Sequence, residues 1–327
     1  MMLEQKMEVK ILAGIILAAF ILSLGYSFYF RITPAVDAAA YDRIAWNLVQ
    51  GNGYKERAEL SYEKDLAIMR VGPGYELFLA AIYFLFGRHY EAAWIINALL
   101  HALSALLVFL IAKEIFKEAG GFFIGAVASA FIAFSPDLIT MSGMLMTETL
   151  GVFLITLSIY LFWRYVNGVA KSAGLLFFTA LVFGFAVMVR TPAALLFLPF
   201  AYYFIRENNW KHFLIFTVIL ILLFMPWIVR NYYVYRAFIP TNLAFGYDLL
   251  AGNHPGATGE LEPYAVNDEF MSHGRIEGNK MALKAALGFI LANPAEFSRI
   301  TLDRISIYFS FARPTGFWFH LHGFAKA

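Results

Sequence analysis

The sequence contains no cysteine among its 327 residues, which excludes disulfide bonds, thiolate metal sites and cysteine nucleophiles. Charged residues are also scarce, at 15%, against about 25% in a typical soluble domain. Hydrophobic residues make up 61% of the chain and aromatic residues 18%. This apolar excess is too large for one water-soluble core, so the composition predicts an all-α polytopic membrane protein. The net charge of +2 does not indicate a nucleic-acid partner.

Familiar catalytic motifs are absent too. The sequence has no HExxH pair, no GxSxG elbow, no P-loop and no GxGxxG that opens a helix. His101 stands alone in the apolar stretch NALLHALSALL, where a buried contact between helices is the expected role. His320 and His322 alternate in an aromatic C-terminal segment, and incidental histidines are favoured there over a metal pair.

Seven apolar runs are long enough, or nearly long enough, to cross a membrane, and they lie at about 11–30, 91–112, 121–135, 149–163, 173–189, 192–205 and 213–229. The first run is longer than the 7–15 residues of a signal-peptide core. An uncleaved anchor is therefore favoured over a cleaved signal, although AVDAAA resembles a cleavage site. A further apolar piece at 74–87 would reach only about 21 Å as a helix, against ~30 Å of hydrocarbon. We expect it to form an interfacial or re-entrant helix.

Basic residues indicate which ends of the spans face inward. With the N-terminus inside, the short inner connections carry Lys113, Lys117, Arg164, Lys171, Arg206 and Lys211. The connection at 135–148 carries no basic residue, so the chain follows the positive-inside pattern. This pattern places segments 31–90 and 231–327 on the outer side of the inner or plasma membrane. Both belong to one membrane-embedded module over 1–327.

Ionisable residues gather where apolar segments end at this outer side. Such residues are costly near lipid and indicate function by default. They are Asp37, Arg70, Glu148, Arg190 and Arg230. Each also has a structural explanation: an arginine can extend to lipid headgroups, Glu148 can stabilise the start of its helix, and Asp37 can cap the next helix.

The residues after Asp37 predict an amphipathic helix over 38–49. One face carries Tyr41, Ile44, Ala45 and Leu48, and Asp42, Arg43 and Asn47 face elsewhere. We expect this juxtamembrane helix to lie along the membrane surface.

The outer ionisable residues suit one kind of chemistry. Guanidinium groups bind phosphate, and a nearby carboxylate can take a proton from an incoming hydroxyl or amine. Substitution at the anomeric carbon of a lipid-linked phosphosugar needs both. His254, in the turn-rich stretch GNHPGATGE, could also reach this site. No cofactor is certain, and a divalent metal stays open with Asp37, Glu148 and His254 as candidate ligands.

At these residues the chain resembles the GT-C glycosyltransferases, in particular the family-39-like branch of protein O-mannosyltransferases and lipid A aminoarabinose transferases. The resemblance extends from about 11 to 312 and rests on seven pieces in order. They are DAAAYDRIAWNLVQGNGY, RVGPGYELFLAAIYFLFG, INALLHALSALLVFLIAKEIF, SPDLITMSGMLMTETLGVFL, RTPAALLFLP, PWIVRNYYVYRAFIPTN and GNHPGATGE.

The resemblance implies a GT-C-like bundle of about seven transmembrane helices, with juxtamembrane helices in the first outer loop. It implies inverting transfer from a polyprenyl-phosphate sugar to a glycan, lipid or protein acceptor, with Asp37 as the general base. Tyr41 matches the aromatic residue that follows, and Arg70, Arg190 and Arg230 fall near donor-phosphate positions. Two features depart from the family. Ala38 replaces a second acid, and there are fewer spans, which leaves room for a partner chain that supplies C-terminal elements.

Two other functions compete with the transferase. A transporter or lipid flippase would favour ionisable residues near the midplane and internal repeats, and this sequence shows neither pattern. A non-catalytic lipid-binding subunit of a glycosylation complex is compatible with Ala38. A co-purifying polyprenyl phosphate favours the transferase or the subunit, and substrate uptake into vesicles favours the transporter.

Overall fold

The computed structural model describes residues 2–168, 172–259 and 266–310, and every regular element in these ranges is helical. The α-helices are α1 (Met2–Phe30), α2 (Asp37–Val49), α3 (Pro73–Phe86), α4 (Tyr90–Ile115), α5 (Gly121–Ala133), α6 (Pro136–Ser142), α7 (Thr147–Asn167), α8 (Ala173–Val189), α9 (Phe197–Arg206), α10 (Trp210–Tyr235), α11 (Phe245–Gly252), α12 (Val266–Ser272), α13 (Arg275–Ala292) and α14 (Pro294–Tyr308). Two 3₁₀ helices, η1 (Ala67–Met69) and η2 (Thr191–Leu196), join them. The all-α prediction is confirmed for these residues. Lys171, His320 and His322 lie outside them.

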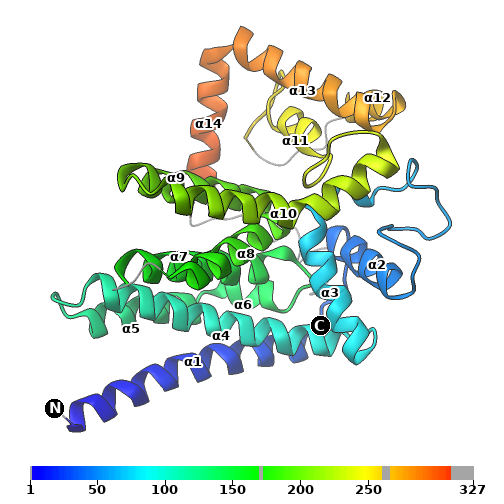
Figure 1. Ribbon diagram of the computed structural model, residues 1–327. Helices are drawn as coiled ribbons and strands as arrows, with labels where there is room; N and C mark the ends of the chain where they lie inside the picture. Colours follow the sequence, from blue (N-terminus) through cyan, green and yellow to red (C-terminus); the bar gives the residue numbers. More distant parts are fainter. Residues whose placement is uncertain (1, 169–171, 260–265, 311–327) are drawn as a thin grey trace.

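The long helices form a bundle in which α1, α4, α5, α7, α9 and α10 run side by side (Figure 1). Helix α4 contacts α1, α5 and α7, and α8 lies between α7 and α10. His101 of α4 joins three helices, because its ring contacts the Ser23 hydroxyl of α1 at 2.5 Å and the Ile132 carbonyl of α5 at 2.9 Å. The predicted helix–helix role of His101 is therefore confirmed.

Within the described ranges, four helices are long and apolar enough to cross a membrane, namely α1, α4, α7 and α10. The expected run at 121–135 is divided between α5 and α6, which meet at an angle of 53° and form either one broken span or a re-entrant loop. Ser135 accepts from the Leu138 amide and Pro136 opens α6, so this sequence starts a new helix there. The run at 173–189 is the short helix α8, and the run at 192–205 starts as η2 before it becomes α9. The count of seven spans remains a prediction.

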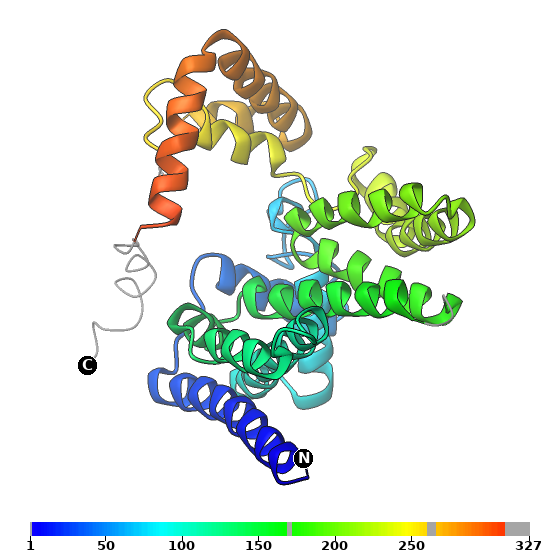
Figure 2. The same cartoon turned by 90° about the vertical axis from the view of Figure 1, so that its left-hand side faces the viewer.

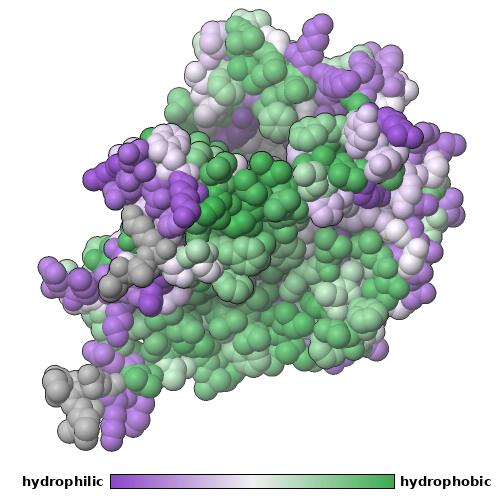
Figure 3. Space-filling model, viewed as in Figure 1, coloured by the Kyte–Doolittle hydropathy of each residue, from purple (hydrophilic) through white to green (hydrophobic). Residues whose placement is uncertain are grey.

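Large apolar side chains cover the outside of the bundle as well as its core. Leu17, Phe131 and Leu222 are 57%, 77% and 61% exposed. Figure 3 shows the hydrophobic surface as a broad continuous area over the long helices. Such an area is incompatible with water contact and fits lipid. The chain is a multi-pass membrane protein.

Aromatic side chains fill the core between α7, α8, α9 and α10. Phe162 stacks on Phe200 with ring centroids 4.1 Å apart, and Phe183 stacks on Phe216 at 5.9 Å. These contacts lie at the interior faces of the helices, where aromatic pairs contribute beyond simple area burial. They join the middle of α8 to α9 and α10.

Helix α2 confirms the predicted amphipathic helix, with two corrections. It begins at Asp37 itself, and Val36 is the N-cap residue, so Asp37 does not cap the helix. Asp42, expected away from the apolar face, is buried and only 4% exposed. Its carboxylate accepts from the Tyr83 hydroxyl at 2.7 Å and from Arg88 at 2.5 and 3.1 Å. The reason is that α2 packs on α3 rather than on lipid alone.

Helix α3 occupies the stretch expected to form an interfacial helix, and its start is pressed against the end of α8. A Cβ on Gly72 would lie 2.7 Å from the Met188 carbonyl oxygen, and one on Gly74 would lie 2.7 Å from the Met188 carbonyl carbon and from the Val189 nitrogen. Gly72 also has a φ of +141°. The two glycines therefore let residues 70–74 reach the end of α8, which carries Arg190.

Helices α11–α14 form a separate group beside the bundle, joined to it near the end of α10 (Figures 1 and 2). The amide of Asn242 donates to the Val71 carbonyl at 2.8 Å, and Leu243 donates to the Ile68 carbonyl at 2.9 Å. The guanidinium of Arg275 donates to backbone carbonyls of Lys64 and Asp65. The two expected outer segments, 31–90 and 231–327, thus contact each other through their described parts.

Candidate functional site

A polar cavity of about 380 Å³ lies at one end of the bundle, and we call it the polar cavity. Its walls come from α2, the segment before α3, the start of α7, the end of α8 and the segment that leads into α11. The lining residues are Asp37, Tyr41, Met69, Arg70, Val71, Met146, Thr147, Glu148, Arg190, Asn242, Ala244 and Asp248. Five of the residues predicted from the sequence therefore meet in one place, although they are up to 153 positions apart in the chain (190 − 37).

The first charged pair of the polar cavity joins Arg70 to Asp37. Nη1 of Arg70 donates to Oδ1 of Asp37 at 2.7 Å, and Nη2 donates to Glu56 at 2.8 Å. Glu56 also pairs with Arg43. Burial raises the pKa of Glu56, but the hydrogen bonds from Arg70 and Arg43 outweigh it and hold the pKa below its usual value. Glu56 therefore stays ionised and fixes the guanidinium of Arg70 beside Asp37.

The second charged pair joins Arg190 to Glu148. Their nearest atoms, Nη1 and Oε1, are 2.6 Å apart, and Nη1 also donates to the Thr147 hydroxyl at 3.1 Å. The stem of Arg190 crosses Gly151, where a Cβ would lie 2.8 Å from Arg190 Cδ. Glu148 stands in the first turn of α7, where a carboxylate is favoured by the helix dipole. Both side chains remain partly exposed, at 36% and 30%, so a ligand can reach them.

Tyr41 and Asp248 complete the wall of the polar cavity. Tyr41 packs edge-on against Tyr75 with ring centroids 5.4 Å apart. Burial, and next the charge of Asp37, raise the pKa of Tyr41, so its hydroxyl stays protonated. Asp248 and Asn242 were not predicted from the sequence. One sequence feature could have indicated Asp248: it is an acidic residue inside the short apolar stretch AFGYDLLAG of the second outer segment.

Glu76 is a further residue that the sequence did not single out. It stands in the first turn of α3, is fully buried and forms no ion pair within the described ranges. The Tyr54 hydroxyl lies close to its carboxyl group. Burial raises the pKa of Glu76 to about 8, so the group is mostly protonated at neutral pH.

Arg230 and His254 do not line the polar cavity. The guanidinium of Arg230 lies over the rings of Tyr54, Tyr62, Trp227 and Tyr235 at 4.8 to 5.7 Å and donates to Asn231 at 2.9 Å. This arrangement ties the end of α10 to the first outer segment by cation–π contacts. His254 is 6% exposed and its Nδ1 donates to the Pro255 carbonyl at 2.9 Å.

The described residues contain no cluster of three His, Asp or Glu side chains that could hold a metal ion. Of the candidate ligands, Asp37 and Glu148 line the polar cavity, and His254 lies outside it. The donor set in this part of the chain therefore does not support a metal centre built from these three residues.

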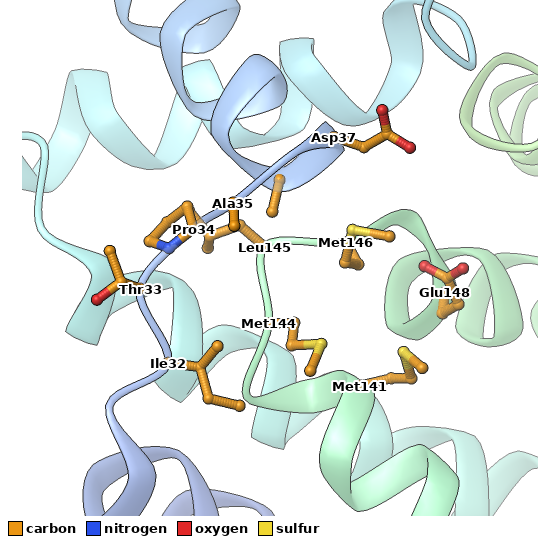
Figure 4. A pocket seen from close by; sticks show the side chains of 11 residues that line it. Ile32, Thr33, Pro34, Ala35, Asp37, Met141, Met144, Leu145, Met146 and Glu148 are labelled. Atoms are coloured by element: carbon orange, nitrogen blue, oxygen red, sulfur yellow. The ribbon is translucent and has the colours of Figure 1, made fainter. Parts of the chain in front are cut away.

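An apolar pocket of about 240 Å³ adjoins the polar cavity, and we call it the methionine pocket. The two spaces share Asp37, Met146 and Glu148. Figure 4 shows Ile32 to Ala35 on one side and Met141, Met144 and Met146 on the other. Flexible methionine side chains suit an irregular apolar ligand. An apolar group in this pocket would therefore lie directly beside two carboxylates.

The fold is a bundle of membrane helices that carries paired carboxylates and guanidinium groups at one end. Residues 70–229, just under half of the chain, match the family model described as dolichyl-phosphate-mannose-protein mannosyltransferase. This match confirms the resemblance to the GT-C glycosyltransferases and indicates a membrane glycosyltransferase. It includes Arg70, Glu148 and Arg190. Comparisons with curated proteins and with solved structures gave no match.

Proposed function

We propose that this protein transfers a sugar from a polyprenyl-phosphate donor to an acceptor at the outer face of the membrane, with inversion and with Asp37 as the general base. The observation that carries the proposal is the polar cavity, which sets two carboxylates beside two guanidinium groups at one end of an apolar bundle. The family match, which gives a glycosyltransferase, supports it. The donor class, the base and the outer location go beyond that match.

Arg70 and Arg190 suit the donor phosphate. Each guanidinium has five N–H donors, and only some of them bind carboxylates. A phosphate between them would take the place of one carboxylate partner on each side. Its charge grows as the bond from the anomeric carbon to the phosphate oxygen breaks, and the two arginines would stabilise that charge.

Asp37 suits the proton transfer. Its side chain is 40% exposed, so an acceptor hydroxyl or amine can approach it. When a phosphate binds Nη1 of Arg70, it replaces Asp37 there, and the Asp37 carboxylate becomes free to accept the proton. The acceptor atom then forms its bond to the anomeric carbon as the phosphate leaves on the opposite face. Tyr41, which keeps its hydroxyl proton, can donate a hydrogen bond to the sugar.

The methionine pocket suits an apolar part of a lipid-linked substrate. It opens beside Asp37 and Glu148, two of the three carboxylates that line the polar cavity. A substrate that carries both a charged phosphate and an isoprenoid chain would occupy the two adjoining spaces together. Arg230 and His254 have no place in this scheme, because they line neither space.

The test is transfer from a panel of radiolabelled polyprenyl-phosphate sugars to membrane acceptors, with wild type, Asp37→Asn and Glu59→Gln. Glu59 is an exposed carboxylate in the same outer segment and serves as the matched control. We expect transfer by wild type and Glu59→Gln and loss of transfer in Asp37→Asn. Normal transfer by a folded Asp37→Asn protein would remove Asp37 from the mechanism. No transfer from any donor, with lipid still bound, would favour a non-catalytic lipid-binding subunit.

A further inference from the structure

A second large cavity lies at the opposite end of the bundle, far from the polar cavity. It has a volume of about 890 Å³, and we call it the basal groove. Its walls are the end of α4, the start of α5 and the end of α7. The lining residues are Leu110, Lys113, Glu114, Ile115, Lys117, Gly121, Phe122, Trp163, Arg164, Asn167 and Gly168. Nothing in the proposed transfer reaction uses this space.

The charge of the basal groove is positive. Lys113, Lys117 and Arg164 supply three cations, and Glu114 supplies one carboxylate. That carboxylate contacts Arg164 at 3.4 Å, a long and exposed pair that contributes little. Within the described part of the chain, neither lysine forms an ion pair. The two lysine side chains are therefore available to bind an anion.

The shape of the basal groove depends on close packing between α4 and α5. A Cβ on Gly121 would lie 2.5 Å from the Lys113 carbonyl oxygen, so only glycine lets α5 begin this close to α4. Phe122 packs edge-on against Phe109 with ring centroids 5.7 Å apart. The groove thus has an apolar side from Leu110, Ile115 and Phe122 and a charged rim from the three cations.

The depth of the basal groove in the membrane determines which molecules can bind there. Helix α4 has 26 residues and is about 39 Å long, so its two ends lie at opposite membrane–water boundaries. Figure 3 shows hydrophilic residues at the left-hand end of the bundle, where α4 turns into α5. Trp163 is an aromatic residue of the kind enriched at such boundaries. Lipid phosphates lie at this depth on whichever side of the membrane this end faces.

We propose that the basal groove binds the phosphate headgroup of an anionic membrane lipid. Lys113, Lys117 and Arg164 would contact the phosphate, and the apolar side of the groove would contact the glycerol and upper acyl carbons. Basic pockets between membrane helices bind such headgroups because the charge attraction adds to burial of the lipid chain. This inference is independent of the transfer reaction and of which residue is its base.

The test measures lipid binding to the full chain by native mass spectrometry, with phosphatidylglycerol and phosphatidylcholine of identical acyl chains. We expect wild type to retain phosphatidylglycerol in preference. The double variant Lys113→Gln/Lys117→Gln is expected to weaken phosphatidylglycerol binding about tenfold and to leave phosphatidylcholine binding unchanged. Lys6→Gln/Lys10→Gln removes the same charge from exposed positions near the start of α1 and is the matched control. It is expected to bind like wild type.

A third variant reverses the sign of the effect. Among the described lining residues Glu114 alone carries a carboxylate, so Glu114→Gln is expected to bind phosphatidylglycerol more tightly than wild type. Equal losses in the groove variant and the α1 control would overturn the proposal, since they would show a general charge effect. Unchanged binding in both would overturn it as well. Inorganic phosphate is added in a parallel arm, and displacement of the lipid at equal concentration would show a free-anion site instead of a lipid site.

Discussion

Arg70 donates from Nη1 to Oδ1 of Asp37 over 2.7 Å, although 33 positions separate the two residues. The contact joins the start of α2 to the segment that precedes α3. Because Glu56 holds the other side of the same guanidinium, Arg70 is positioned before any substrate arrives. Preorganised charge of this kind is what stabilises a developing anion most effectively.

Arg70→Lys tests that geometry. Lysine keeps the charge but cannot contact Asp37 and Glu56 with separate N–H groups in one plane. We expect the KM for the donor to rise about tenfold while the protein stays folded. The measurement is transfer kinetics at varied donor concentration, with Arg57→Lys, an exposed arginine of the same segment, as the control. Unchanged donor KM in Arg70→Lys would contradict phosphate binding by Arg70.

Asp37→Asn tests the base. Removing a general base lowers a rate by about 10² to 10⁴. We expect kcat to fall within that range and donor binding to persist, because the asparagine amide can still face the cavity. Single-turnover transfer and donor binding, measured on the same preparation, separate the two effects. Loss of donor binding with no change in the chemical step would assign Asp37 to substrate binding.

Glu76→Gln gives a pH-dependent effect on stability. The pKa of Glu76 is about 8 in the folded protein, above the usual value of 4.5, so the folded state holds a proton that the unfolded state has released. Wild-type stability therefore falls by up to about 1.4 kcal/mol per pH unit as pH rises from 4.5 to 8. Glutamine does not titrate, so the stability of Glu76→Gln relative to wild type should increase as the pH rises from 4.5 to 8.

The measurement for Glu76 is thermal unfolding of both proteins in one detergent between pH 5 and pH 9. Glu59→Gln, at an exposed position, is expected to follow wild type at every pH. A constant difference between Glu76→Gln and wild type would show that Glu76 does not carry an extra proton in the folded state.

Gly74→Ala tests the contact between α3 and α8. The added methyl group would lie 2.7 Å from the backbone of Met188 and Val189, so α3 must shift. We expect a loss of about 1–3 kcal/mol of stability, together with reduced transfer because Arg70 moves with α3. In Gly14→Ala, on α1, the methyl group meets no atom within 4 Å, and no loss is expected. Equal unfolding temperatures for the two variants would contradict the close approach.

Asp42→Asn tests the ion pair between the buried Asp42 and the partly exposed Arg88. Asparagine removes the charge that pairs with Arg88 and one acceptor of the buried Tyr83 hydroxyl. We expect a loss of about 1–3 kcal/mol in unfolding free energy. Asp303→Asn breaks an exposed pair with Arg299 on α14 and should leave unfolding unchanged. Similar behaviour of the two variants would show that the Asp42 pair is not protected from water.

The sequence by itself determined the class of this protein and many of its site residues. Apolar runs and scarce charge are local properties that need no tertiary structure, and they predicted a helical membrane protein. Ionisable residues at the ends of apolar segments identified Asp37, Arg70, Glu148 and Arg190. The motif order indicated a resemblance to membrane glycosyltransferases, and a family model of that kind matches residues 70–229.

The tertiary structure alone decided which of these residues meet. It paired Arg70 with Asp37 and Arg190 with Glu148, and it placed Arg230 among aromatic rings outside the polar cavity. The sequence could not predict that Asp42 and Glu76 are buried, because their burial depends on how α2 and α3 pack together. Helical periodicity describes only one helix at a time. Contacts between residues far apart in the chain arise from packing, so no local pattern could have revealed them.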